Sequence, residues 1–234
     1  FKRELATGAG KVFNRNVVQQ DLQRVYGLGL FQDVNVSLNP GQDPRKVVVV
    51  VNVDERRSGS VGLSGGISSA SGLFGAISYQ EQNLGGNNQK LGAELQIGTE
   101  RKDLLFDVRF TDPWIAGDRL RTGYSVNVFN QRAVQSVFTG GDRDVNLPNG
   151  RNPWVHRLGG GISFSRPLAP KLTAALGLSY QQVSIRDSMF SSRLEPRDRL
   201  NNRLTFSNSG QDDLLTLNLS AAWDWRNNDE NPTS

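Results

Sequence analysis

The sequence has no cysteine, one histidine and one methionine among its 234 residues. Without cysteine the chain can form neither disulfide bonds nor thiolate metal sites. A zinc site or a Ser–His–Asp triad would have to be built around His156 alone. No run of about 18 apolar residues occurs anywhere in the chain, and a transmembrane helix needs one. Transmembrane helices and disulfide cross-links are therefore excluded.

Basic residues are in slight excess but do not form a dense block. The 27 lysines and arginines against 23 acidic residues give a net charge of +4. The aromatic residues lie at apolar positions rather than between basic ones, whereas nucleic-acid binding usually needs a concentrated basic patch. We therefore expect no nucleic-acid partner.

Between Ser60 and Thr111 the polarity alternates from residue to residue over four runs, which Gly, Ser, Asn or charged residues separate. In one of these runs the apolar residues are Leu91, Ala93, Leu95 and Ile97. A period of two predicts β-strands with one apolar and one polar face. Each run has roughly ten residues, which suits a membrane-crossing strand of about 9–11 residues. Soluble β proteins show the same balance, so this pattern alone leaves both classes open.

The pattern continues in residues 119–131, 154–166, 171–186 and 215–225, which gives eight expected strands. The expected connections after the second, fourth and sixth strands are short. Those after the fifth and seventh, residues 133–153 and 187–213, are long and fall on one side. Outer-membrane barrels have short periplasmic turns and long external loops. The asymmetry favours such a barrel, and an aromatic girdle is predicted from the tryptophans near strand ends: Trp114, Trp154, Trp223 and Trp225.

The first 54 residues or so follow a different pattern. Residues 2–6 are expected to end a helix, and Asn14 or Asn16 is the expected N-cap of a second helix that stops at Gly27 and Gly29. Alternating runs at residues 31–38 and 46–55 predict two strands. The order helix, helix, strand, strand indicates a small α+β module.

Several motifs together resemble the BamA-type outer-membrane assembly family, whose members join POTRA domains to a bacterial surface antigen barrel. The run from Gly29 to Val36, GLFQDVNV, is similar to a POTRA motif. The barrel motifs are Gly72–Gly75, Asn83–Gly86, Thr111–Trp114 and Trp223–Asn228 followed by Pro232-Thr233. Asn228 departs from the family pattern, which usually has aspartate there. The resemblance covers nearly the whole chain.

The resemblance implies a fold in which an α+β POTRA module is followed by an antiparallel transmembrane β-barrel. Residues 1–56 would be the C-terminal POTRA module, and residues 57–234 the first eight of sixteen barrel strands. The first POTRA strand would precede Phe1, and the family's lumen loop would follow Ser234, so the chain is expected to be a fragment. Eight strands alone are not expected to close, because an open sheet leaves two bare edges in lipid.

The implied function is the assembly and insertion of outer-membrane β-barrel proteins, without catalysis. The resemblance implies a seam at the first barrel strand that binds client strands: Val61, Leu63, Gly65, Gly66 and Ile67. It also implies an exposed POTRA edge that binds clients or accessory subunits: Asp33, Val34, Asn35, Val36 and Ser37. An ordinary edge strand remains the alternative for the second set.

The implied partners are unfolded outer-membrane proteins or other translocated polypeptides, periplasmic accessory subunits and the lipid bilayer. The implied location is the bacterial outer membrane or the plastid outer envelope, with the POTRA module in the periplasm or intermembrane space. A polypeptide secretion or import pore of the same superfamily, or a passive porin, stays open as an alternative. The amino-terminal module argues against the porin, since a plain channel has no need of it.

Reactive residues give little support for an enzyme or a cofactor. His156 shares the parity of Trp154 and Leu158, which is more typical of a strand-edge histidine than of a catalytic base. Asp142, Asp144 and Asn146 are spaced somewhat like calcium ligands, but the later Gly and Glu of a calcium loop are missing. The glycines at 159–161 precede no helix, as a phosphate-binding loop requires. We expect no catalytic residue, no metal and no cofactor.

Overall fold

The structure is a computed structural model that describes residues 2–68, 72–98, 103–134 and 145–225. The chain divides into two compact units. The small unit contains Phe1–Gly59 and Gln82–Asn88, and the large unit contains Ser60–Glu81 and Gln89–Ser234. Within the described parts of the chain, no helix is long and apolar enough to cross a membrane.

Helix α1 (Arg15–Gly27) forms one layer of the small unit. Asn14 is its N-cap, since the Oδ1 atom accepts a hydrogen bond of 2.9 Å from the backbone N–H of Asn16. The helix ends at Gly27, and Gly29 has a φ of +69°, a left-handed conformation that glycine adopts without strain. The predicted N-cap and stop are both confirmed. The first predicted helix is wrong in extent, because only Lys2–Glu4 form a short 3₁₀ turn.

Strands β1 (Phe31–Pro40) and β2 (Val47–Glu55) form an antiparallel hairpin beside α1. The buried side chains of Val25, Leu30 and Phe31 form the core, and Leu5, Leu28, Val34 and Val53 pack against them. Apolar positions on α1 and alternate positions on the strands meet there, as the two periodicities predict. The predicted order of helix, helix, strand and strand holds for α1, β1 and β2, while the first helix is reduced to the 3₁₀ turn at Lys2–Glu4.

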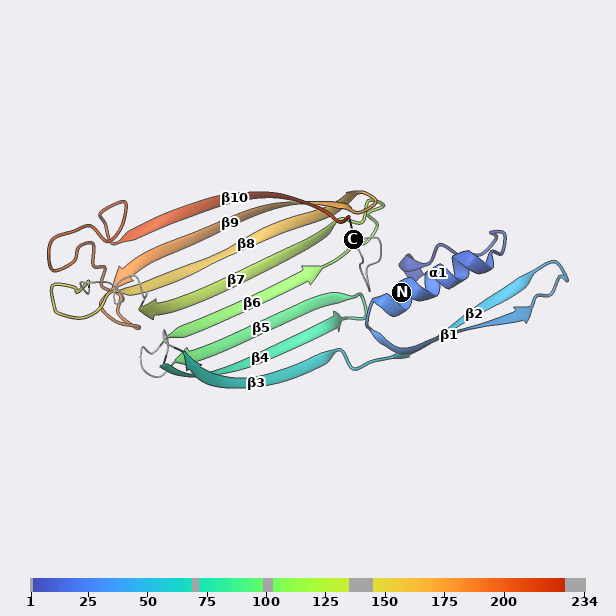
Figure 1. The fold of residues 1–234 in the computed structure, drawn as a ribbon, viewed down its shortest axis with the longest axis horizontal. Coiled ribbons are helices and arrows are strands. Elements are labelled where there is room, and N and C mark those ends of the chain that lie inside the picture. Colours follow the sequence, from blue (N-terminus) through green and yellow to red (C-terminus); the bar gives the residue numbers. More distant parts are fainter. Residues whose placement is uncertain (1, 69–71, 99–102, 135–144, 226–234) are drawn as a thin grey trace. The chain divides into compact units, whose positions relative to one another are not determined.

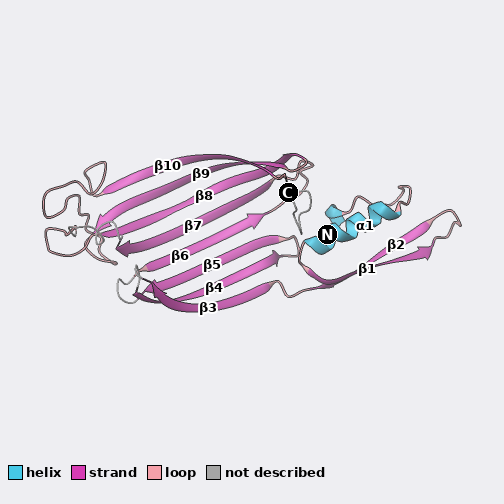
Figure 2. Cartoon of the chain, in the orientation of Figure 1, coloured by secondary structure: helices cyan, strands magenta, loops and turns pink. Residues whose placement is uncertain are grey.

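Eight antiparallel strands form the sheet of the large unit (Figures 1 and 2). In chain order they are β3 (Gly59–Ser68), β4 (Gly72–Leu84), β5 (Gln89–Gly98), β6 (Leu104–Asp112), β7 (Gly123–Val134), β8 (Trp154–Ala169), β9 (Leu172–Arg186) and β10 (Gln211–Trp223). Each strand lies next to its neighbour in sequence, with β3 at one edge and β10 at the other. The predicted number and order of strands are confirmed.

The predicted start of the fifth strand of this sheet was wrong. β7 begins at Gly123 rather than Arg119, because Asp118 organises a turn in front of it. The Asp118 carboxylate accepts hydrogen bonds from the backbone N–H groups of Leu120 (3.1 Å) and Thr122 (2.7 Å). A hydrogen bond from the Thr122 side chain, together with these two backbone bonds, lowers the pKa of Asp118 to about 2. Leu120 therefore lies in the turn and not on the strand face that its parity suggests.

Two other boundaries of the sheet also differ from the prediction. β8 runs on to Ala169, so the turn before β9 is tighter than the expected segment 167–171. β10 begins at Gln211 instead of Leu215, which shortens the preceding loop. Backbone pairing continues beyond the alternating pattern in both places, through residues 167–169 on β8 and through the polar residues 211–213 on β10.

Candidate functional site

One face of the sheet from β5 to β10 is apolar and exposed. Directly paired residues of adjacent strands lie on the same face of a sheet. The pairs Leu95↔Phe106, Ile162↔Leu178 and Leu178↔Leu217 therefore show which residues belong to this face. We call it the apolar face. Its exposed members are Leu95, Ile97, Phe106, Val128, Leu158, Ile162, Phe164, Leu176, Leu178, Leu215, Leu217 and Leu219. An apolar surface of this extent requires cover from another apolar phase.

The opposite face of the same strands carries polar and small side chains, and we call it the polar face. The pairs Glu94↔Asp107 and Gly177↔Asn218 belong to it. On β9 the apolar face extends from Leu172 to Tyr180, which spans about 26 Å at 3.3 Å per residue. An apolar band about 25 Å tall on one face and a polar second face are typical of the wall of a membrane β-barrel.

Tryptophans lie near strand ends, as predicted. Trp223 ends β10 and stacks on Trp225, with 4.6 Å between the ring centroids. Trp114 follows β6, and its Nε1–H donates to the carbonyl oxygen of Asp118 at 2.6 Å. Trp154 begins β8 at the other end of the sheet. Indole rings in such positions suit the two interfaces of a membrane.

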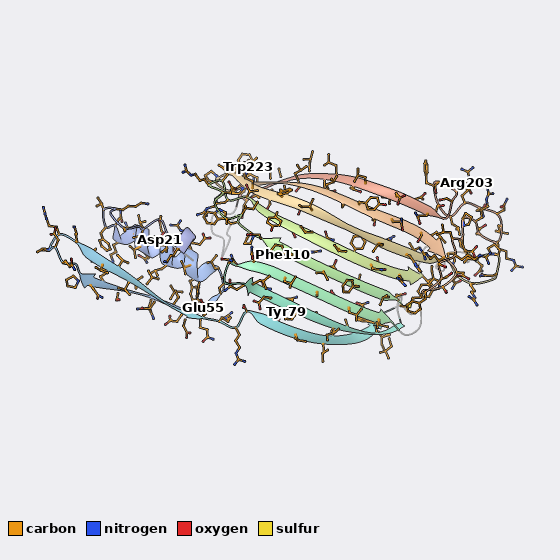
Figure 3. All side chains as sticks on the ribbon, turned by 180° about the vertical axis from the view of Figure 1, so that it is seen from behind. Asp21, Glu55, Tyr79, Phe110, Arg203 and Trp223 are labelled. Carbon is orange, nitrogen blue, oxygen red and sulfur yellow. The ribbon has the colours of Figure 1, made fainter. Side chains whose placement is uncertain are left out.

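The described parts of the long connections pack together at one end of the sheet. Leu147 is fully buried against Val155 and Ile185, and Leu204 packs against this cluster. Arg203 of the same connections and Trp223 lie at opposite ends of the sheet (Figure 3). We call these ends the loop end and the turn end. The expected separation of long loops from short turns is therefore confirmed for the described residues.

His156 lies at the loop end on β8 and is buried. Its Nε2 is 3.0 Å from the backbone carbonyl oxygen of Ser188, so this nitrogen carries the proton and donates it to the hydrogen bond. The imidazole thereby attaches the loop after β9 to the sheet. Of the three residues compared with a calcium loop, Asp142 and Asp144 lie outside the described residues. The backbone carbonyl of Asn146 accepts a hydrogen bond from Arg199.

The predicted seam residues lie on β3, an edge strand whose sequence neighbour in the sheet is β4. Val61, Leu63 and Ile67 are exposed, with relative accessibilities of 68%, 81% and 84%. Gly66 faces the ring of Phe74, and a Cβ at Gly66 would come within 3.2 Å of that ring. Apart from this contact, small side chains leave β3 with little to pack on. The strand is thus held to the sheet mainly through backbone pairing with β4.

The predicted POTRA-edge residues lie on β1, in register with β2. Asp33 is opposite Asp54, and Val36 is opposite Val51. The hairpin has two strands, so β1 has one strand partner among the described residues. The second edge of β1 therefore offers the kind of backbone groups that an added strand could pair with.

Two residues that the sequence pattern did not identify stand out at the loop end. Arg132 of β7 and Arg186 of β9 lie on the apolar face, because Arg132 pairs with His156 and Arg186 pairs with Trp154. The available signal was a basic residue at an apolar parity, two alternate positions beyond Val128 on β7 and four beyond Leu178 on β9.

Comparison with known families gives two matches along the chain. Residues 83–234 match the Omp85 superfamily domain. Residues 1–56 match the surface antigen variable number repeat, which is the POTRA family.

Individual relatives come from plastids and bacteria. The chain is 35% identical over 227 residues to outer envelope protein 80, chloroplastic, of Oryza sativa subsp. japonica, with 94% of this chain and 33% of the relative aligned. It is 33% identical over 96 residues to the outer membrane protein assembly factor BamA of Neorickettsia risticii, with 41% of this chain and 13% of the relative aligned. The chain thus spans about a third of the length of the plastid relative.

A solved structure supports the same fold. BamA from Haemophilus ducreyi lacking POTRA domains 1–3 aligns with a TM-score of 0.67 and 16% identity. The alignment covers 99% of this chain and 42% of that one. The predicted fold class, a POTRA module followed by part of an antiparallel barrel, is therefore confirmed.

Proposed function

The chain belongs to the Omp85 superfamily, and from that premise we propose that it assembles and inserts β-barrel proteins into an outer membrane. Its place is the outer membrane, bacterial or plastid, with the POTRA module on the periplasmic or intermembrane-space side. The observation that carries the proposal is one chain with a POTRA module and an amphipathic eight-stranded wall, since its bacterial relatives with these domains are outer membrane protein assembly factors.

Backbone chemistry supplies the mechanism in this proposal. An unpaired N–H or C=O group in lipid costs several kcal/mol, so a client strand gains by pairing with any available edge. β3 offers such an edge, and Val61, Leu63 and Ile67 already present apolar side chains beside it. A client strand that pairs with β3 enters the membrane with the backbone groups of one edge satisfied. Exchange of one paired edge for another needs no nucleotide and no catalytic residue.

The β1 edge of the POTRA module has a complementary role in the proposal. An extended client segment, or an accessory subunit, adds to β1 beside Asp33–Ser37 and is held by backbone hydrogen bonds. Such bonds do not depend on the client's sequence, which suits a protein that receives many different clients. Pairing with β1 keeps the client segment extended until it pairs with β3 instead.

Photo-crosslinking in the full-length protein tests the role of β3. We expect a photoreactive residue at position 63, in place of Leu63, to form adducts with a nascent barrel protein. The matched control carries the same residue in place of Val128, which is also exposed on the apolar face but lies on the central strand β7. Adducts are detected by their molecular mass on denaturing gels with a labelled client.

The outcomes separate assembly from translocation. Client adducts at position 63 and none at position 128 support assembly at the β3 edge. Absence of adducts at position 63, with ion conductance intact, would contradict it. Adducts confined to positions on the polar face, such as Asn127, would instead favour a pore that passes a polypeptide through the lumen.

A further inference from the structure

Two arginines end the apolar face at the loop end of the sheet. Arg132 projects from β7 and Arg186 from β9, on either side of β8 with its buried His156. On the same face, Leu158 lies one alternate position from His156 on β8, and Val128 lies two from Arg132 on β7; both are exposed. Together with Phe190 of the following loop, Arg132 and Arg186 form what we call the arginine rim. On β7 the polar Asn130 separates Arg132 from the apolar residues of this face, and on β9 Gln182 and Ser184 separate Arg186 from them. The long loops begin just beyond the two arginines.

Neutral oxygens hold both guanidinium groups in place. Arg132 donates from Nη1 to the carbonyl oxygen of Met189 at 3.0 Å and from Nε to Oδ1 of Asn130 at 3.3 Å. Arg186 donates from Nη1 to the carbonyl oxygen of Ser191 at 2.7 Å and from Nε to Oγ of Ser184 at 3.2 Å. These bonds orient the groups but leave their charge uncompensated.

No carboxylate neutralises the arginine rim within the described residues. Asp187 follows Arg186 in sequence but forms its ion pair with Arg151, at 3.7 Å. Asp213 on β10 accepts a hydrogen bond of 2.8 Å from the hydroxyl of Tyr180. The Nη2 groups of Arg132 and Arg186 form no hydrogen bond to any described residue, so each arginine can still donate to an anion.

Phe190 adds an exposed aromatic ring to the arginine rim. The guanidinium of Arg132 lies over its ring, 5.7 Å from the centroid, and the ring is 78% exposed. A cation beside an exposed aromatic ring suits the border between headgroups and acyl chains, where one side is charged and the other apolar. Water alone would favour burying this ring, whereas an amphiphile satisfies the ring and the cations together.

We propose that the arginine rim binds the phosphorylated headgroup of a lipid with a net negative charge in the outer leaflet, whose acyl chains lie along Leu158 and Val128. Charge complementarity supports an anion, because two arginines meet no acidic partner there. Arginine forks bind phosphate oxygens with paired, charge-assisted hydrogen bonds. Continuity with the apolar face supports a lipid rather than a free anion. The bound lipid would fix the height of this wall in the membrane.

Native mass spectrometry of the full-length protein tests this proposal. The protein is released from detergent in the presence of diphosphorylated lipid A, phosphatidylcholine or inorganic phosphate. The test variant is Arg132→Gln with Arg186→Gln. The matched control is Arg203→Gln, an exposed arginine of the same loop end that pairs with no acidic group among the described residues. Heat-modifiable migration on gels establishes that each variant folds.

We expect the wild-type protein and Arg203→Gln to retain lipid A and the double variant to retain roughly tenfold less, which corresponds to the loss of about one charge-assisted hydrogen bond. Retention of lipid A by the folded double variant at the wild-type level would overturn the proposal. So would equal retention of phosphatidylcholine, which has no net charge, or displacement of lipid A by an equal concentration of inorganic phosphate. Displacement by an acidic peptide would point to a protein ligand and overturn it as well.

Discussion

Replacing Gly159 by alanine should destabilise the folded protein by about 2–3 kcal/mol, the range for forcing an extra methyl group into packed structure. A Cβ at this position would lie 2.6 Å from the backbone oxygen of Tyr180 and 2.9 Å from Cζ of Phe129. The first contact is with backbone, so β8 and β9 would have to separate at this rung of the ladder. The measurement is the midpoint of urea unfolding in detergent or lipid, which should fall.

Gly92→Ala is the matched control for this prediction. Gly92 also lies inside a strand on the polar face, opposite Arg109, but a Cβ there would meet no atom within 4 Å. Alanine loses less conformational entropy on folding than glycine, so this variant should be neutral or stabilised by about 0.5 kcal/mol. Equal shifts of both midpoints would show that the close approach of β9 does not explain the glycine at 159.

The sequence pattern predicted the eight strands well because the wall of a barrel strongly restricts which residue types can occupy successive positions. Every backbone group must pair within the sheet, and each side chain must face either lipid or lumen, so polarity alternates with a period of two. Leu95 and Phe106 were therefore assigned to one face from sequence alone, and the register confirms them. The start of β7 could not be found in this way, since it depends on the hydrogen bonds of Asp118.

The loop end depends on contacts between residues far apart in sequence, which no local pattern encodes. Leu147 precedes β8 in the sequence and Leu204 follows β9, yet the two side chains belong to one hydrophobic cluster. Arg132 and Arg186 were visible only as exceptions to the apolar alternation, and nothing in either strand alone indicates that they flank His156. The residues predicted to form the seam were easier to place on a strand, because that placement depends only on β3 being the first strand of the sheet.

Replacing Asp21 by asparagine should destabilise the POTRA module by about 2 kcal/mol, in the range for losing hydrogen bonds to a charged group. Asp21 is only 2% exposed and accepts hydrogen bonds from the backbone N–H groups of Ala6 (2.9 Å) and Thr7 (2.7 Å), and from Arg24. Its carboxylate thus attaches the segment before α1 to the helix. Asparagine keeps the size but turns one acceptor into a donor. Amide hydrogen exchange of α1 and residues 2–7 in the full-length protein should show the lost protection.

The loss of protection caused by Asp21→Asn should also depend on pH, and the direction of the pKa shift of Asp21 determines whether it shrinks or grows on acidification. Burial raises the pKa of Asp21, but hydrogen bonds from Thr7 and Ala6 and the charge of Arg24 outweigh it, so the pKa lies below its usual value. A lowered aspartate pKa contributes stability that is complete above about pH 4 and is lost as the pH falls through the lowered value. The difference in protection between wild type and variant should therefore hold from pH 7 to 5 and shrink below pH 4. Glu55→Gln, at an exposed glutamate at the end of β2 that lies opposite Phe31 and has no such bonds, should change protection at no pH. A difference that grew on acidification would mean that the carboxylate is not the group that holds these segments together.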